Sequence, residues 1–168
     1  MSVMQLQSFI AGHWLGHEPG QTLRSAINGQ PVARTHAEAV DFAEALAYAR
    51  DTGLPGLLAL DFQQRAARLK ALAKYLAERK EQLYAISAHT GATRADSWID
   101  IEGGTGTLFA YASLGSAELP SSNLVHEGPV VPLGKQGGFA GTHILVPRRG
   151  VAVHINAFNF PIWGLLEK

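Results

Sequence analysis

The chain has 168 residues, 46% of them hydrophobic and 17% charged, with 14 basic and 14 acidic side chains, so its composition is globular and offers no positive field for nucleic acid. No apolar run is long enough to span a bilayer and the N-terminus lacks a signal-peptide pattern, so we expect a cytoplasmic protein without a membrane partner. The chain contains no cysteine, which excludes disulfides, thiolate metal sites and a cysteine nucleophile from these residues.

Residues 8 to 34 are predicted to form extended strands joined by tight turns. Short apolar segments alternate there with turn formers, among them Gly12, Gly16, Pro19 and Gly20. A further short segment at residues 31 to 34 follows the turn-like pair Asn28-Gly29. This pattern favours a small hairpin or paired edge strands.

A first helix is predicted from Thr35 to Arg50. Thr35 and Glu38 stand three residues apart, which is the spacing of a capping box at a helix start. Apolar residues then recur at helical spacing, namely Val40, Ala43, Leu46 and Ala47. The helix is expected to end before the helix breakers that follow, Gly53, Pro55 and Gly56.

A second and longer helix is predicted from Asp61 to Gly91. Asp61 and Gln64 repeat the capping pattern, and Gly91 is suited to end a helix. Between them runs an apolar stripe made of Phe62, Ala66, Leu69, Leu72, Leu76, Leu83 and Ile86. Charged side chains occupy the other faces, which we interpret as a solvated surface rather than a binding site.

A third helical segment carries the glycines Gly103, Gly104 and Gly106. Residues at helical spacing continue through it: Trp98, Ile101, Thr105, Leu108 and Ala112. The glycines could instead form a phosphate-binding loop, but no further glycine completes a Gly-x-Gly-x-x-Gly pattern and no Gly-Lys-Ser or Gly-Lys-Thr follows. We therefore favour a helix in which the glycines are close-packing positions.

Residues 124 to 133 and 139 to 146 are predicted to form two long strands joined by a flexible, glycine-rich turn. A two-stranded hairpin is marginally stable by itself. We therefore expect this one to pack on another subunit or on another part of the chain.

The last segment combines a strand, a tight turn and a helix start. Residues 149 to 155 form a continuous apolar run of the kind that is buried on both faces of a parallel sheet. Pro161 is well placed as the first residue of a helix. Because ligands bind at the carboxyl ends of strands in open α/β sheets, the turn between them is a candidate site, and the predicted fold class is α/β.

Other candidate sites are weaker. His13 and His17 are four residues apart, but the neighbouring glycines and Pro19 argue against the helix that would bring them onto one metal, so no metal site is predicted. The acids Asp96, Asp100 and Glu102 could line a cleft and serve in acid–base chemistry. We expect the face shared by positions 96 and 100 to point to solvent.

The segment Asn156-Ala157-Phe158-Asn159-Phe160-Pro161 follows Gly150-Val151-Ala152-Val153. Here the chain resembles the aldehyde dehydrogenase superfamily, which carries a Pro-Trp-Asn-Phe-Pro element after a Gly-Val strand. Asn159, Phe160 and Pro161 match that element directly, whereas Ala157 and Phe158 replace its proline and tryptophan. The resemblance covers essentially the whole chain, including residues 9 to 14, residues 64 to 69 and Thr90-Gly91.

A narrower resemblance is carried by residues 130 to 135, residues 145 to 161 and Trp163-Gly164. These residues are similar to the semialdehyde dehydrogenases of CoA-linked aromatic degradation. That group includes a bifunctional phenylacetate-pathway enzyme with a C-terminal hydratase and a related dehydrogenase of the benzoyl-CoA pathway.

The resemblance implies that the α/β fold is the N-terminal part of the aldehyde dehydrogenase fold, with helices and short strands, a protruding β-hairpin and the start of a Rossmann-like parallel sheet. Residues 1 to 122 are then the first part of the cofactor-binding domain, and residues 123 to 147 an oligomerisation hairpin. Residues 148 to 168 are the first strand, turn and helix start of the dinucleotide-binding core.

The implied activity is the NAD(P)-dependent oxidation of an aldehyde, carried as a CoA thioester in the narrower group, and that group favours NADP over NAD. Asn159 is implied as the catalytic side chain whose amide stabilises the oxyanion. The nicotinamide end of the cofactor is expected to contact Ile155, Asn156, Ala157 and Phe158. The hairpin at residues 124 to 146 is expected to join subunits into a homo-oligomer.

Two pairs of alternatives stay open. Members of the family are much longer than this chain and carry their nucleophilic cysteine beyond the stretch that it matches. The chain is therefore either the N-terminal part of a complete dehydrogenase, inactive alone, or a truncated, non-catalytic interaction module. Asn159 either donates to the oxyanion or only caps the turn before Pro161.

Overall fold

The computed structural model describes residues 3–168, so Met1 and Ser2 of the predicted first domain lie outside it. Its N-terminal part is made of two small sheets. One has the strand order β1 (Met4–Gln5), β5 (Pro31–His36), β4 (Pro19–Arg24), with β1 parallel and β4 antiparallel to β5. The other is the antiparallel pair β2 (Ser8–Ile10) and β3 (His13–Leu15). The predicted extended region is confirmed.

The first helix, α1 (Phe42–Tyr48), begins after Asp41 and not at Thr35, so the predicted start is wrong. Asp41 caps it by accepting hydrogen bonds from the Ala43 and Glu44 amides. The Thr35 hydroxyl accepts instead from the Gln21 amide at 2.9 Å, and the Glu38 carboxylate from the His17 amide at 2.7 Å. Both side chains of the expected capping box therefore accept from residues far away in sequence, Gln21 in β4 and His17 in the loop before it.

The expected helix break near Gly53 is also wrong, because the helical winding continues through it. A π-helical turn at Ala49–Gly53 leads into α2 (Leu54–Leu58), and the Leu54 amide donates to the Ala49 carbonyl. Pro55 lies in the first turn of α2, directly after the π-helical turn, so the wider winding ends where the helix lacks one backbone amide.

The predicted long helix is divided into α3 (Phe62–Ala77), α4 (Lys80–Ser87) and a short 3₁₀ turn at Ala88–Thr90. Its start is confirmed, since Asp61 and Gln64 form a capping box, and Gly91 ends it with φ +89°. At the break the Arg79 amide donates to the Leu76 carbonyl. The Arg79 guanidinium donates a hydrogen bond of 3.1 Å to the Tyr75 carbonyl, which the break leaves without its helical partner, and it lies over the Tyr75 ring.

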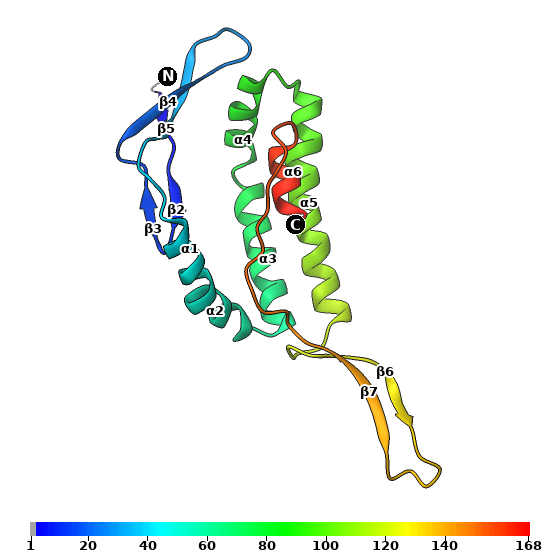
Figure 1. Ribbon diagram of the computed structural model, residues 1–168. Helices are drawn as coiled ribbons and strands as arrows, with labels where there is room; N and C mark the ends of the chain where they lie inside the picture. The colour runs from blue at the N-terminus through cyan, green and yellow to red at the C-terminus, as the bar shows by residue number, and fades with distance from the viewer. Residues whose placement is uncertain (1–2) are drawn as a thin grey trace.

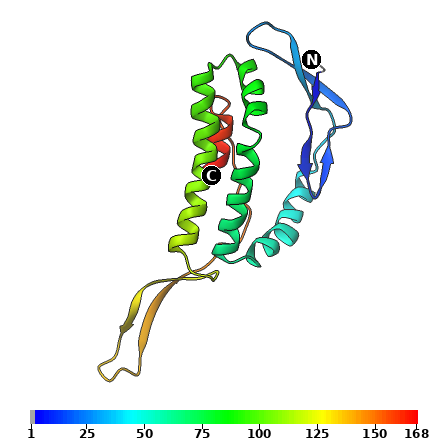
Figure 2. The same ribbon diagram turned by 180° about the vertical axis from the view of Figure 1, so that it is seen from behind.

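Helix α5 (Arg94–Glu118) runs through all three glycines, so the helical interpretation of that segment is confirmed. Its packing against α3 makes the core of the molecule, and α6 (Pro161–Leu166) lies on α5 (Figures 1 and 2). The buried apolar side chains at these contacts are small or come from α5: Ala66, Ala73, Ile101, Leu108 and Ala112. No helix within residues 3–168 is long and apolar enough to cross a membrane.

The predicted hairpin is present as β6 (Val125–Pro132) and β7 (Ala140–Leu145), paired from Val125 opposite Leu145. It projects away from the helices (Figure 1). Its apolar side chains are exposed, among them Val130, Leu133 and Phe139. The described part of the chain therefore offers the hairpin no packing partner.

The strand predicted at residues 149 to 155 is not formed. This segment returns along the helices from the hairpin to α6, in front of α3 in Figure 1 and behind it in Figure 2, without pairing to another strand. Val153 is 80% and Ile155 90% exposed. A strand buried on both faces needs strand neighbours, and residues 3–168 supply none at this place.

Candidate functional site

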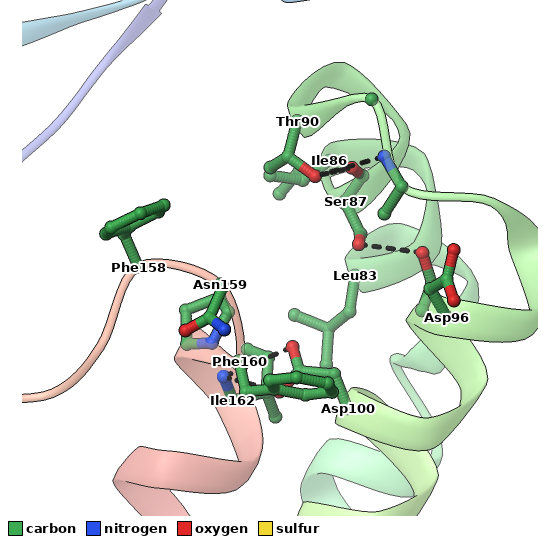
Figure 3. Close-up of a pocket in the computed structure, with 14 residues that line it drawn as sticks. Leu83, Ile86, Ser87, Thr90, Asp96, Asp100, Phe158, Asn159, Phe160 and Ile162 are labelled. Carbon is green, nitrogen blue, oxygen red and sulfur yellow. Dashed lines mark hydrogen bonds between the residues drawn. The ribbon is translucent and has the colours of Figure 1, made fainter.

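A cavity of about 460 Å³ lies where the end of α4, the start of α5 and the turn before α6 meet (Figure 3). Most of its lining is apolar, including Leu83 and Ile86 from α4 and Phe158 and Ile162 from the other side. Polar side chains enter it at a few points only. A largely apolar cavity with few polar groups is the usual setting for binding a small molecule.

Asn159, the candidate catalytic residue, lies in this lining, on the turn that leads into α6 (Figure 3). Its side chain is exposed and, within residues 3–168, does not cap α6. The amide is therefore free to donate to a group that enters the cavity.

The four candidate cofactor residues are only partly gathered here. Phe158 lines the cavity, whereas Ile155, Asn156 and Ala157 lie before it on the extended segment. Ile155 and Phe158 are 90% and 94% exposed, and the buried Oδ1 of Asn156 has no hydrogen-bond partner within the described residues. The exposed apolar side chains fit a ligand with an apolar ring, whereas the buried Oδ1 of Asn156 would have to turn outward to accept from it.

Asp100 is buried, with 4% of its surface exposed, so the expectation that it points to solvent is wrong. Its Oδ1 accepts from the Ile162 amide at 3.1 Å and the Trp163 amide at 2.8 Å, and its Oδ2 lies 3.3 Å from the Ile162 amide. Asp96 does stay exposed, where it forms a capping box with Thr93 at the start of α5. Asp96 and Asp100 both line the cavity, as the sequence allowed, but the contact of Asp100 with the start of α6 was not predicted.

One signal in the sequence could have revealed this contact. The residue before α6 is Phe160, which has no side-chain acceptor, so the first amides of α6 need a cap from elsewhere. Burying a carboxylate is costly unless it is hydrogen-bonded, and the helix terminus supplies two donors.

The glycines of α5 adjoin the same contact. A Cβ on Gly103 would lie 2.8 Å from the Trp163 ring, and a Cβ on Gly104 would lie 2.8 Å from the Trp163 Cα. Gly103 and Gly104 are therefore close-packing sites, as predicted, and α6 lies directly against the α5 backbone. For Gly106 the prediction is wrong, because a Cβ there would meet nothing within 4 Å.

Two hydroxyl groups close the cavity on the side of α4. Ser87 Oγ on α4 and Ser97 Oγ on α5 are 2.8 Å apart, and both residues line the cavity. Their contact ties the two helices together at the cavity wall. Because each hydroxyl is engaged by the other, the pair acts here as a structural link.

Glu102, the third acid, lies outside the cavity in a charged cluster between α4 and α5. Its Oε1 accepts from Lys80 Nζ at 2.8 Å and from the Tyr84 hydroxyl at 3.3 Å. The hydrogen bond from Lys80 is the main cause that holds the pKa of Glu102 below its usual value. Burial is the main cause that raises the pKa of Tyr84, and Glu102 adds to it.

The cluster also includes Arg94, whose guanidinium donates hydrogen bonds to both carboxylate oxygens of Glu81. The same guanidinium stacks on the Tyr84 ring, with its carbon 3.5 Å from the ring centroid. The cluster joins helices and leaves no free carboxylate for acid–base work. No group of three His, Asp or Glu side chains within residues 3–168 is arranged to hold a metal ion.

Comparison with known proteins gives a consistent result. The model of the aldehyde dehydrogenase family matches residues 17–168. The chain is 40% identical over 167 residues to a 3,4-dehydroadipyl-CoA semialdehyde dehydrogenase of Aromatoleum evansii, covering 98% of this chain and 32% of that protein. It is 29% identical over 141 residues to a vanillin dehydrogenase of a Pseudomonas strain, covering 83% of this chain and 27% of that protein.

Among solved structures, the fold matches a point mutant of betaine aldehyde dehydrogenase from Staphylococcus aureus in complex with NAD⁺. The TM-score is 0.59 at 18% identity, over 77% of this chain and 26% of that one. At 18% identity the match shows a similar fold and nothing about function. The chain thus spans about a third of the length of the curated relatives that it matches.

Proposed function

The chain belongs to the aldehyde dehydrogenase family, and from that premise we propose that it is the N-terminal part of an NAD(P)-dependent enzyme that oxidises a CoA-linked semialdehyde to the acid in aromatic degradation. The proposed substrate rests on the relative that is 40% identical over nearly the whole chain. The narrower resemblance favours NADP over NAD.

The observation that carries the proposal is the free amide of Asn159 at the cavity. During attack on an aldehyde, the carbonyl oxygen gains negative charge, and a fixed amide donor stabilises that charge more than it stabilises the ground state. The cap of α6 comes from Asp100, so Asn159 is not needed for it. This favours oxyanion stabilisation over the alternative role in capping the turn.

The residues before Asn159 are proposed to bind the nicotinamide end of the cofactor, which when bound accepts a hydride from the substrate. Ile155 and Phe158 present exposed apolar side chains to a ring, and the unpaired Oδ1 of Asn156 can accept from a carboxamide N–H once its side chain turns outward. The family's nucleophilic cysteine and general-base glutamate are expected from the rest of the complete enzyme, since this chain holds no cysteine.

The test is Asn159→Ala in the complete enzyme. Turnover should fall by about two to three orders of magnitude, because a donor to the oxyanion is lost. The affinity for cofactor and the melting temperature should change little, since Asn159 caps nothing. Asn28→Ala, in an exposed turn of the N-terminal part, is the matched control and should keep full turnover. A full rate in Asn159→Ala would remove Asn159 from catalysis.

A second experiment tests the substrate class. The complete enzyme should have a higher kcat/KM for an aliphatic semialdehyde carried on CoA than for vanillin, because the relative named for the CoA-linked substrate is the more similar one. A preference for the free aromatic aldehyde would contradict the proposed substrate while leaving the reaction type intact.

A second candidate function is a non-catalytic interaction module. It is favoured by the projecting hairpin, on which Val130 and Phe139 are 64% and 66% exposed. In the complete enzyme the same hairpin is proposed to join subunits into a homo-oligomer. The interaction module is the better description if the 168-residue chain captures a full-length dehydrogenase in a pull-down and the gene encodes no product longer than this chain.

A further inference from the structure

We propose that Asp100 is a positioning residue for catalysis, which acts by holding the turn that carries the Asn159 amide. The inference rests on the proposed role of Asn159 in stabilising the oxyanion. Asp100 lies on α5 and Asn159 directly before α6, so the two are brought together only by the packing of these helices.

Within residues 3–168, Asp100 is the one side chain that caps α6. Pro161 has no amide hydrogen, so the first free amides of the helix belong to Ile162 and Trp163. Both donate to the Asp100 carboxylate, at 3.1 and 2.8 Å to the same oxygen. Phe160 at the cap position offers no side-chain acceptor. These bonds fix the backbone three and four residues after Asn159.

Helix α5 presents one face to this turn. Asp100, Gly103 and Gly104 stand at positions i, i+3 and i+4, which lie on the same side of a helix. The carboxylate binds the amide of Trp163, and the two glycines leave space for its ring and backbone. The start of α6 is thus held by hydrogen bonds and by close packing at once.

The side chain of Asn159 is exposed at the cavity, with no contact to the described residues that holds its amide. The backbone that Asp100 secures therefore sets the position from which this amide reaches into the cavity. Misplacing a catalytic donor by about 1 Å can cost about a hundredfold in rate. Loss of the Asp100 contact should therefore lower kcat without contact between Asp100 and the reacting atoms.

The test is a double-mutant cycle in the complete enzyme with Asp100→Leu, Asn159→Ala and the double variant. Leucine keeps the size of the side chain and removes both acceptors. Asp100→Leu should lower kcat about ten- to a hundredfold, with KM changed less than about threefold. In the Asn159→Ala background the same change should cost less than about twofold, because the donor that it positions is already gone.

Two further variants separate positioning from charge and from general damage. Asp100→Asn keeps an acceptor oxygen and should restore most of the rate lost in Asp100→Leu. Asp51→Leu makes the same change at an exposed aspartate of the π-helical turn and should leave kcat unaltered. Hydrogen exchange at the Ile162 and Trp163 amides should be faster in Asp100→Leu and unchanged in Asn159→Ala.

The outcomes are distinguishable. If Asn159→Ala has full activity, the proposed function of Asn159 fails, whatever Asp100 does. If Asn159→Ala is impaired but Asp100→Leu is not, or the two losses multiply in the double variant, the positioning role is overturned. Should Asp100→Leu not fold, Asp100→Ala, which also removes both acceptors, replaces it in the cycle, and a loss of kcat without faster exchange at Ile162 and Trp163 then contradicts the proposal.

Discussion

At the scale of single residues, the closest backbone approach at the site is that of Trp163 to Gly104. A Cβ at this glycine would lie 2.8 Å from the Trp163 Cα and 3.0 Å from its nitrogen, and backbone atoms cannot move aside as a flexible side chain can. Gly104→Ala should therefore push α6 outward and lower the free energy of unfolding by about 1–3 kcal/mol. Thermal or urea unfolding of the complete protein measures this change.

Gly106 provides the matched control in the same helix. It is exposed, and a Cβ there would meet nothing within 4 Å. Gly106→Ala should raise the free energy of unfolding by about 0.5–1 kcal/mol, because alanine favours the helix more than glycine does. Equal effects of the two substitutions would show that packing against Trp163 does not decide the cost.

Contacts between single residues also explain why part of the site could be predicted from the sequence and part could not. The resemblance pointed to Asn159 directly, and Asn159 does lie at a cavity. Asp100 was named as a possible cleft residue, but its burial and its role as a cap were not predicted, because its partners are 62 and 63 residues away, at a helix start whose position on α5 depends on the packing of the whole molecule. Helical spacing places Asp96 and Asp100 on the same face of α5, and it is the packing of α6 that buries Asp100 while Asp96 stays exposed.

At the scale of elements, Glu102 links α4 to α5, and its pKa gives that link a pH dependence. Its folded pKa is lowered, mainly by the hydrogen bond from Lys80, so the contribution to stability is present above the unfolded value near 4.5. It is lost as the pH falls through the folded pKa. The melting temperature of the wild type should exceed that of Glu102→Gln at neutral pH, and the difference should shrink below about pH 4.5.

The control for this prediction is Glu118→Gln, at the other end of α5, where no ion pair is formed with the described residues. Its melting temperature should differ little from that of the wild type across the same range. A difference between wild type and Glu102→Gln that stayed constant down to pH 3 would mean that the carboxylate does not hold the two helices together.

The elements also show which local signals can be trusted. Asp61 with Gln64 and Thr35 with Glu38 have the same spacing, yet only the first pair forms a capping box. The second pair instead accepts from the amides of Gln21 in β4 and His17 just before it, because the pairing of β4 with β5 brings both amides within reach. A capping pattern is local, whereas strand pairing is not, and the sequence gives no register for partners so far apart.

At the scale of the whole molecule, the chain supplies one wall of the proposed cofactor site. Three of the four candidate residues, Ile155, Asn156 and Ala157, lie outside the cavity, on a segment that has no strand neighbours within residues 3–168. The predicted strand at 149 to 155 failed for this same reason. Its apolar run has the composition of a buried strand but no sheet to join.

The isolated 168-residue chain should accordingly bind NADP or NAD weakly or not at all. A site with one wall leaves most of the ligand in water, so little apolar surface is buried and few polar groups are satisfied. Calorimetric titration of the chain with each cofactor measures this directly. A dissociation constant in the micromolar range would show that these residues form a sufficient site by themselves.

The hairpin gives the last prediction. The hairpin projects from the helices (Figure 1), and within residues 3–168 its apolar side chains stay largely exposed. Because two strands alone are marginally stable, we expect a partner surface to bury them. Val125 and Leu145 are paired across its base, so a short Gly-Ser linker can replace residues 124 to 146 without straining the helices on either side. Light scattering of the complete protein with this deletion should give the mass of a monomer.

A single substitution tests the same surface without removing the hairpin. Phe139, 66% exposed, lies where β7 begins, and Phe139→Asp places a charge where an apolar contact with the other subunit is expected, so dissociation should occur at higher protein concentration than in the wild type. Ile27→Asp makes the same change at a side chain that is 65% exposed in the turn between β4 and β5, and should leave the assembly intact. An unchanged oligomer after deletion of residues 124 to 146 would place the subunit contact elsewhere.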